Sequence, residues 1–331
     1  MKKNWFTAGL LSCLCLSTFA QESTNKNAEK DSKKGEAIVT IFTNFHSGFG
    51  ENNDDRGFDL ERSYLGYQYN LNGGLQVKAV MDIGRSSDVG DYQRIAYIKN
   101  AMISWKYKDL TLNGGLIGTN QFGLQEKFWG KRYVMKSFQD EYKMGSSADL
   151  GLSAAYKFAP WISGDIILVN GEGYKKIQIN DGLQYGAGVT VTPVNGLTLR
   201  VYGSYNEAAD KEKSGMANMA AFVGYAQEKF SVGAEYNYQS NASFTKECNQ
   251  NGVSAYTTVQ LCPRLGIYGR WDYLSSKDDW NKSNDGMAGM VGAEVKLGKY
   301  IKLAPNFRIW SPKDDSKKNS YYAYLNCSFS L

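Results

Sequence analysis

The chain has 331 residues, a formal net charge of +5 and 21% charged residues. So small a positive excess does not predict a nucleic-acid-binding surface. A mean hydropathy of −0.45, with 14% aromatic residues and 35 glycines against 5 prolines, is typical of strands that alternate between lipid and water. After residue 20, no apolar stretch approaches the ~20 residues of a membrane helix, so a membrane span must be built from strands.

The first twenty residues have the pattern of a secretory signal peptide, which we predict to span Met1 to Ala20. Lys2 and Lys3 precede an apolar run from residue 5 to 19, and small residues precede the cleavage point. Removing these two lysines lowers the formal charge from +5 to +3. Residues 21–35 are polar, mixed in charge and without apolar period, which predicts a flexible periplasmic lead. Residues 36–331 form the remaining domain.

That domain consists of about ten-residue segments of alternating hydrophobicity, sixteen in all, separated by breaks. The segments are 36–48, 58–70, 75–85, 96–107, 110–117, 148–158, 162–169, 183–192, 197–205, 216–225, 230–238, 253–261, 265–274, 287–297, 301–310 and 321–331. In the third segment, one face carries Leu75, Val77, Ala79, Met81 and Ile83. A period of two with one apolar face predicts a strand that meets apolar surroundings on one side only.

The connections between these segments alternate in length. All seven even-numbered breaks are two to four residues long, whereas the odd-numbered breaks run from nine residues at 49–57 to thirty at 118–147. Outer-membrane barrels have short periplasmic turns, longer outer loops and an even number of strands. A soluble β-sandwich would need a second sheet over each apolar face and does not predict this alternation. We therefore predict an all-β, 16-stranded antiparallel transmembrane β-barrel.

Aromatic residues gather at both ends of the segments, as in the two interfacial girdles of a membrane barrel. Beside the short turns lie Tyr67, Tyr69, Trp105, Tyr107, Phe158, Trp161, Tyr225, Phe230 and Tyr300. Beside the long loops lie Tyr205, Tyr236, Tyr238, Trp271, Tyr273, Trp310 and Tyr321.

The third long connection, 118–147, is expected to fold inward and narrow a water-filled pore, because loops of more than ~15 residues usually have a functional reason. Arg132, Lys136 and Asp140 are spaced four apart, as are Val134, Phe138 and Tyr142, which predicts a short helical turn with a charged face and a packing face. Gly118, Gly123, Gly130 and Gly145 are expected at its sharp bends. The alternative is an outward lid packed on neighbouring loops.

The alternation assigns nine basic residues to the inner face of the barrel. They are Arg62, Lys78, Lys106, Lys157, Arg200, Arg270, Lys296, Lys302 and Arg308. The same face is expected to carry five acidic residues, Asp82, Asp165, Glu235, Asp272 and Glu294. A sixteen-stranded barrel leaves an aqueous channel, and a positive excess on its wall favours anions over cations. The alternative is that these charges pair across strands.

The run GLQEKFWGKRYVMKSFQDEYKMGSSADLG at 123–151, together with sixteen strands and a long third loop, resembles the Bacteroidetes porins that group with the phosphate-selective porin O and P family. The resemblance implies a trimeric channel for small anions such as phosphate. It places Lys127, Lys131, Arg132 and Lys136 at the constriction. The chain departs from this family in being short and in ending Ser-Leu after Phe329, so phosphate preference does not follow from the fold.

Other functions find less support in the sequence. A barrel-embedded hydrolase would need a histidine base, and His46 is the only histidine. An adhesion barrel would need several long outer loops. Cys248, Cys262 and Cys327 are odd in number and too far apart along the strands for a disulfide framework. We expect no cofactor and no transition-metal site, since histidines and cysteines do not cluster.

Overall fold

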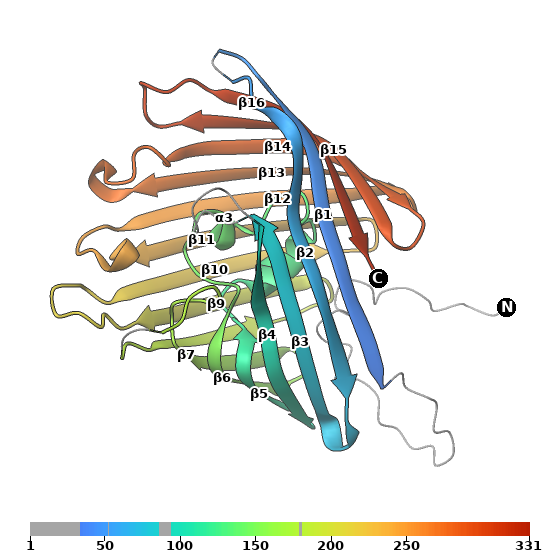
Figure 1. Ribbon diagram of the computed structural model, residues 1–331, viewed down its shortest axis with the longest axis vertical. Helices are drawn as coiled ribbons and strands as arrows, with labels where there is room; N and C mark the ends of the chain where they lie inside the picture. The colour runs from blue at the N-terminus through green and yellow to red at the C-terminus, as the bar shows by residue number, and fades with distance from the viewer. Residues whose placement is uncertain (1–33, 52, 86–93, 179–180) are drawn as a thin grey trace.

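The computed structural model describes residues 34–51, 53–85, 94–178 and 181–331. The predicted signal peptide, 1–20, and most of the predicted lead, 21–33, lie outside these described residues. Between β1 and β16, each strand is hydrogen-bonded to its neighbours in the sequence, and β1 also pairs with β16, so the sheet closes into a barrel (Figure 1). All sixteen pairings are antiparallel. The predicted 16-stranded antiparallel barrel is confirmed.

The strands lie close to the predicted segments. The first eight are β1 (Gly35–Phe49), β2 (Arg56–Asn70), β3 (Leu75–Arg85), β4 (Arg94–Tyr107), β5 (Leu110–Gly118), β6 (Ala148–Ala159), β7 (Ile162–Val169) and β8 (Gln184–Val191). The others are β9 (Leu197–Asn206), β10 (Met216–Ala226), β11 (Phe230–Ser240), β12 (Gln250–Cys262), β13 (Leu265–Ser276), β14 (Gly286–Leu297), β15 (Ile301–Pro312) and β16 (Ser320–Ser330). The largest difference is at β12, which begins at Gln250, three residues before the predicted start.

Alternation along each strand separates an apolar exposed face from a polar buried face. In β13, Arg270 and Asp272 are 5% and 1% exposed, while Trp271 and Tyr273 between them are 44% and 36% exposed. Successive side chains of a strand point to opposite faces, so the two pairs cannot share a side of the wall. The charged side chains of β13 therefore lie on the buried face of the wall, and its aromatic rings lie on the exposed face.

Register shifts interrupt strict alternation in four strands, β2, β4, β6 and β12. In β4 the partners of Val80 and Met81 are Asn100 and Ile98, which leaves Lys99 unpaired in the register. In β2 the partners of Phe42 and Thr43 are Arg62 and Leu60, which leaves the residue between them unpaired in the same way. A bulge adds one residue to one strand and re-aims the side chains beside it.

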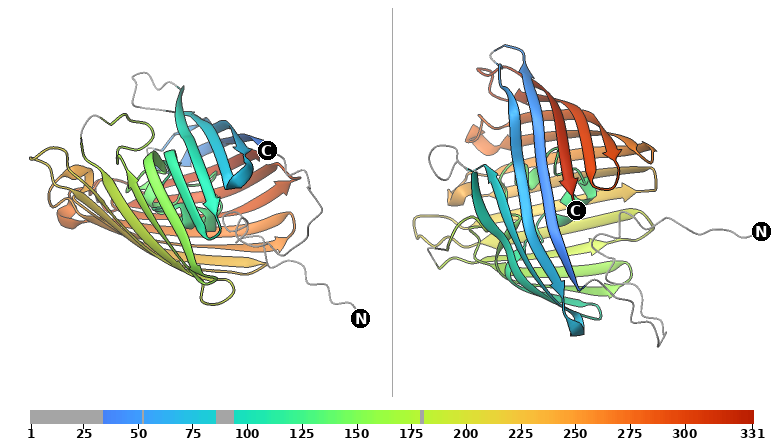
Figure 2. Two further views of the ribbon diagram at one scale, coloured as in Figure 1. Left: turned by 90° about the horizontal axis from the view of Figure 1, so that it is seen from below. Right: turned by 45° about the vertical axis from the view of Figure 1, so that its right-hand side comes forward.

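The connection from β5 to β6 contains two short helices, α2 (Gly123–Trp129) and α3 (Phe138–Glu141), within a segment we call the docked segment, residues 119–147. In Figures 1 and 2, these helices lie between the side of the barrel formed by β1–β4 and the side formed by β10–β15. Among the described residues, no helix is both long and apolar enough to cross a membrane.

Candidate functional site

The docked segment is held to the polar face of the wall by hydrogen bonds between residues far apart in the sequence. Backbone carbonyls of the segment accept from wall side chains: Arg308 Nη2 donates to the Val134 oxygen at 2.7 Å, and Asn326 Nδ2 to the Tyr133 oxygen at 3.0 Å. Arg270 Nη1 donates to the Lys136 oxygen in the same way. These bonds use the buried, charged face of β13, β15 and β16, and none of their wall partners belongs to the exposed aromatic face.

Side chains of the segment also reach the wall. Tyr133 donates its hydroxyl to Glu294 Oε2 at 2.8 Å, and burial followed by the Glu294 charge raises the pKa of Tyr133, so the donor stays protonated. Gln139 Nε2 donates to Asn237 Oδ1 at 2.6 Å. The contacts on both the backbone and the side chains fix the segment to a wall that spans from β11 to β16.

An apolar cluster completes the docking. Trp129, which is 2% exposed, lies 5.4 Å from the ring of Tyr256 and 5.9 Å from that of Tyr268, measured between centroids. On the other side of the barrel, Phe42 of β1 contacts Tyr133 at 6.1 Å. Aromatic contacts of this kind contribute about 0.5–1.5 kcal/mol each beyond the area they bury. The segment therefore contacts strands on opposite sides of the barrel.

The short helical turn predicted from the spacing of residues 132–142 forms only in the last part of that range, as α3. Helix α2 ends at Trp129, because Gly130 adopts a left-handed φ of 64° that closes the helix with a bond from its N–H to the Glu126 oxygen. Trp129 Nε1 then donates to the Met135 oxygen at 2.8 Å, which holds 130–137 in a turn before α3 begins at Phe138. Of the four glycines expected at bends, Gly130 alone has a positive φ.

The structure places the four predicted constriction residues in different environments. Lys127 is exposed, and Lys136 is half-buried without an ion pair within 4 Å among the described residues. Arg132 is paired with Glu126 and Asp140 of its own segment. Lys131 is 6% exposed and donates to Thr258 Oγ1 at 3.0 Å. Two of the four basic residues, Lys127 and Lys136, therefore present a positive charge to solvent.

Two titratable side chains of the segment have lowered pKa values, which favours the charged form of Asp140 and the neutral form of Lys131. Burial alone would raise the pKa of Asp140, but Arg132 and Lys136 outweigh it and hold this pKa below its usual range. Burial lowers the pKa of Lys131 to about 8, with Lys302 and Lys296 adding to the shift and Glu294 opposing it. Lys131 therefore changes charge near neutral pH, unlike an ordinary lysine.

Five of the nine basic residues predicted on the inner wall, Arg62, Arg200, Arg270, Lys302 and Arg308, divide into paired and unpaired groups. Arg62 pairs with Asp82 on the neighbouring strand at 3.2 Å, Arg200 with Asp165 across β8 at 2.6 Å, and Arg270 with Asp272 on its own strand at 2.7 Å. Lys302 and Arg308 have no carboxylate within 4 Å in the part of the chain that the structure describes. The alternative that wall charges only neutralise one another thus holds for the first group and fails for the second.

Comparison with protein-family models and with curated proteins by sequence finds no match. Solved structures do match. OprB of Pseudomonas putida superimposes with a TM-score of 0.71 at 13% identity, covering 90% of this chain and 94% of that one. OmpF of Salmonella typhi, in complex with daunomycin, gives 0.70 at 11%, covering 92% and 100%. An anion-selective porin from Comamonas acidovorans gives 0.67 at 12%, covering 90% and 99%.

The chain has the porin fold. At these identities the likeness concerns the fold alone, so the residues that line a solute path must be found in this chain itself.

One basic residue on the polar face of the barrel was not predicted. Lys99 donates to Ser147 Oγ at 3.1 Å and lies over the rings of Tyr64 and Tyr174, at 4.9 Å and 5.2 Å from their centroids. Strict alternation missed it because the β4 bulge places both Lys99 and Asn100 toward the same side. The sequence does carry a signal, since the apolar positions of this strand change phase after Ile98.

Tyr174, from the connection between β7 and β8, was missed as well. Its hydroxyl donates to Asp82 Oδ2, the same carboxylate that pairs with Arg62. This outer connection is itself held by Asp149, whose Oδ2 accepts from the Gly171 and Gly173 amides at 2.8 Å and 3.0 Å. A long-range contact of this kind has no local sequence pattern.

Trp310 was predicted to belong to the outer aromatic girdle, and this is wrong. It stands two residues after Arg308 on β15, so both side chains face the same side of the wall. Trp310 and Arg308 also line one pocket with Tyr142 of the docked segment. The tryptophan therefore lies on the polar face, with the arginine.

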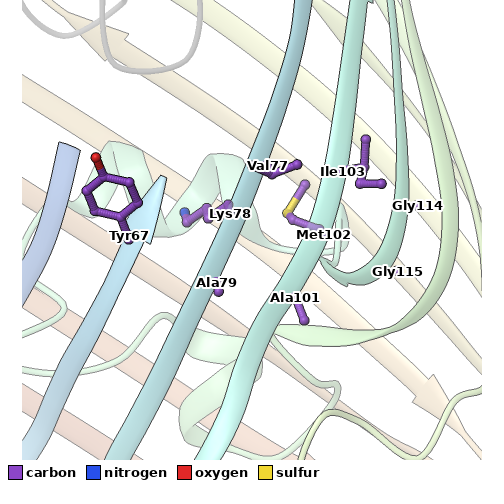
Figure 3. Close-up of a pocket in the computed structure, with 9 residues that line it drawn as sticks. All are labelled: Tyr67, Val77, Lys78, Ala79, Ala101, Met102, Ile103, Gly114 and Gly115. Carbon is purple, nitrogen blue, oxygen red and sulfur yellow. The ribbon is translucent and has the colours of Figure 1, made fainter. Parts of the chain in front are cut away.

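A hollow of about 560 Å³ opens among β2, β3, β4 and β5, and Figure 3 shows the side chains that line it. Tyr67 pairs with Ala79, which pairs with Ala101, so these three share one face, and Tyr67 is exposed. Lys78 is the one charged residue of its lining. The hollow belongs mainly to the apolar exposed surface and does not have the polar lining of a solute path.

His46, the one candidate base for a hydrolase, lies among polar groups near the outer end of β1. Its Nδ1 is 3.0 Å from Asn44 Oδ1, its Nε2 is 3.5 Å from Asp55 Oδ1, and its ring is 5.4 Å from that of Tyr324. In the described ranges, no serine, threonine or cysteine side chain is hydrogen-bonded to this imidazole. A hydrolase site at His46 would therefore have an acid beside the histidine but, among the described residues, no nucleophile hydrogen-bonded to it.

Proposed function

We propose that the protein is an outer-membrane porin, a passive diffusion channel for small hydrophilic solutes with a weak preference for anions. The observation that supports this best is the division of the closed barrel into an exposed apolar face and a buried ionic face. A barrel wall in lipid must satisfy its backbone internally and present apolar side chains outward, while ionic side chains need water or partners. A sixteen-stranded barrel is wide enough to hold that water.

The docked segment is proposed to narrow this channel, with Lys127 and Lys136 facing the solute. Their charges lack ion-pair partners in the described part of the chain, whereas Arg132 is bound by two carboxylates and fixes the shape of the segment. An unpaired cation in a low-dielectric wall replaces part of the hydration an anion loses on entry. Phosphate is one candidate anion, as the family resemblance implies.

The remaining features of the proposal concern location and assembly. We propose export through the signal peptide Met1 to Ala20, insertion into the outer membrane, and assembly as a homotrimer, as in the Bacteroidetes porins that the chain resembles. Cross-linking of the refolded protein, with and without heating in detergent, tests the assembly. A species that stays monomeric before heating would contradict the trimer and leave the channel itself intact.

Planar-bilayer conductance of the refolded protein tests the central claim. We expect stable open steps, with a reversal potential under a salt gradient whose sign corresponds to anion preference. If no open steps are seen, the channel proposal is contradicted, and the adhesion and hydrolase hypotheses become the ones to test. A cation preference would contradict the charge assignment while leaving the channel in place.

A further inference from the structure

A second pocket lies where the docked segment meets the last four strands, and we call it the side pocket. It encloses about 270 Å³. The segment contributes Glu141 and Tyr142 to its lining, and strands β15 and β16 contribute Arg308, Trp310, Tyr322 and Tyr324. Its volume is close to the lower end of the ~300–1,000 Å³ usual for small-molecule sites.

One charged pair of the side pocket, Arg270 and Asp272, is already hydrogen-bonded within the protein, which leaves it little capacity to bind a ligand. Arg270 donates from Nε to Asp272 Oδ1 at 2.9 Å, from Nη2 to Asp272 Oδ2 at 2.7 Å, and from Nη1 to the Lys136 oxygen. Tyr142 adds its hydroxyl to Asp272 Oδ2 at 3.3 Å. A bidentate pair that is 5% and 1% exposed neutralises itself.

Arg308 is the cation of the pocket that remains without a carboxylate. Its Nε donates to Asn306 at 2.8 Å, and its Nη2 to the Val134 oxygen at 2.7 Å and to Asn326 at 3.0 Å. All of these acceptors are neutral. Among the described residues Nη1 has no hydrogen-bond partner, and it is not one of the side-chain atoms buried without one. The guanidinium is thus held in place while one of its nitrogens stays accessible.

Glu141 is the matching anion. Within the described ranges its carboxylate makes neither an ion pair nor a side-chain hydrogen bond, and the residue is half-buried at the C-terminal end of α3. After the Arg270–Asp272 pair is set aside, the side pocket therefore holds one unpaired cation and one unpaired anion. A simple anion would meet Arg308 but be repelled by Glu141, and a simple cation would meet the reverse.

Aromatic rings supply the rest of the pocket. The Arg308 guanidinium lies over the ring of Tyr324 with 3.7 Å between Cζ and the centroid, and Tyr324 lies 5.7 Å from Tyr322. Tyr142 and Trp310 also line it. Such rings accept an apolar or aromatic body and hold the arginine rigid.

We infer that the side pocket binds a zwitterionic α-amino acid with an apolar or aromatic side chain. The ligand carboxylate accepts from Arg308 Nη1, its ammonium faces Glu141, and its side chain packs on the rings. The inference that this is a subsite for permeating solute rests on the proposed channel function, whereas the binding itself does not.

Calorimetric titration of the refolded protein with L-phenylalanine, 3-phenylpropionate and 2-phenylethylamine tests the pocket. We expect L-phenylalanine to bind at least about tenfold more tightly than either ligand that lacks one charge, since each of these ligands loses one charge-assisted hydrogen bond. Arg308→Gln should weaken L-phenylalanine and 3-phenylpropionate and should not weaken 2-phenylethylamine, whose repulsion by the arginine it removes. Glu141→Gln should weaken L-phenylalanine and 2-phenylethylamine, and it keeps the test valid if Arg308→Gln does not fold.

Equal affinity for all three compounds, or affinities that neither substitution alters, would overturn the assignment. Lys317→Gln, an exposed outer-loop change, is the control and should leave all three affinities unchanged. The same preparation in a planar bilayer separates the two proposals. Open steps without amino-acid binding would refute the side pocket alone, and binding without open steps would refute the channel alone.

Discussion

The two sides of the barrel treat their charges differently. On the β9–β13 side, Arg200 and Arg270 are buried and paired with Asp165 and Asp272, and Arg270 also holds the backbone of the docked segment. On the β2–β4 side, Lys78 and Lys99 have no carboxylate within 4 Å in the described part of the chain. Arg62 of β2 is paired with Asp82 on this side as well, at 3.2 Å. The first side thus pairs these cations and uses Arg270 to fix the segment, whereas the second side keeps two lysines without a carboxylate partner.

The number of charged residues on a wall therefore does not by itself determine the net charge that a passing ion encounters. A paired arginine with a carboxylate at 2.7 Å presents little net field to a passing ion, whereas an unpaired lysine presents most of its charge. We therefore expect anions to pass between the docked segment and the β2–β4 side, near Lys99 and Lys136. The charges of Lys136 and Lys99 both lower the pKa of Asp140, a residue of the docked segment.

The largest effect is expected from removing Arg132. Arg132→Ala leaves Glu126 and Asp140 without their partner in a half-buried site, and breaking such a pair costs about 3 kcal/mol or more. The segment should loosen, so we expect a lower urea midpoint for the refolded protein and a noisier, larger single-channel conductance. Unchanged noise with an unchanged midpoint would show that this ion pair does not hold the segment.

The next effect concerns selectivity. The double change Lys99→Glu and Lys136→Glu should lower the anion-to-cation permeability ratio roughly twofold or more, because both charges lack partners. The matched control removes a whole ion pair, with Asp165→Asn and Arg200→Gln together, and should leave the reversal potential unchanged. If the control shifts it as much as the lysine changes, the distinction between paired and unpaired charges does not describe the channel.

The strands were predictable and the pairing of charges was not, for physical reasons. Alternation is a local property, so the segment 75–85 could be assigned from residues two apart, and it matches β3. Pairing depends on register and side-chain geometry: Arg200 reaches Asp165 across β8, 35 positions away in sequence. Bulges break the local rule itself, which is why Lys99 is absent from the predicted wall cations.

The docked segment shows the same limit. Its length predicted an inward loop and its spacing by four predicted a helical turn over residues 132–142, but the chain turns without a helix there until α3 begins at Phe138. Arg132 still meets Asp140, through a turn and not through a helix face. The site for Trp129 is formed by Tyr256 and Tyr268, from strands 127 and 139 positions later in the chain, and no local pattern identifies them.

A smaller effect should follow from pH. Because burial lowers the pKa of Lys131 to about 8, raising the pH from 7 to 9 removes a positive charge beside Lys302 and Lys296, and anion preference should fall. The same shift means that the folded state favours neutral Lys131, so its contribution to stability is lost as pH falls through 8. Lys131→Met should abolish this step in the reversal potential, and a step that persists would have to come from another group.

The smallest effect is expected at Lys317, in the outer connection between β15 and β16. This side chain is exposed and donates to the Ser283 oxygen at 3.1 Å. In 0.1 M salt the Debye length is about 10 Å, so an exposed outer-loop charge is screened from ions inside the barrel. Lys317→Glu should therefore shift the reversal potential far less than Lys136→Glu, although both reverse one charge. Equal shifts would mean that Lys136 stands no nearer to the ion path than an outer loop does, and the docked segment could not then be the part of the chain that selects anions.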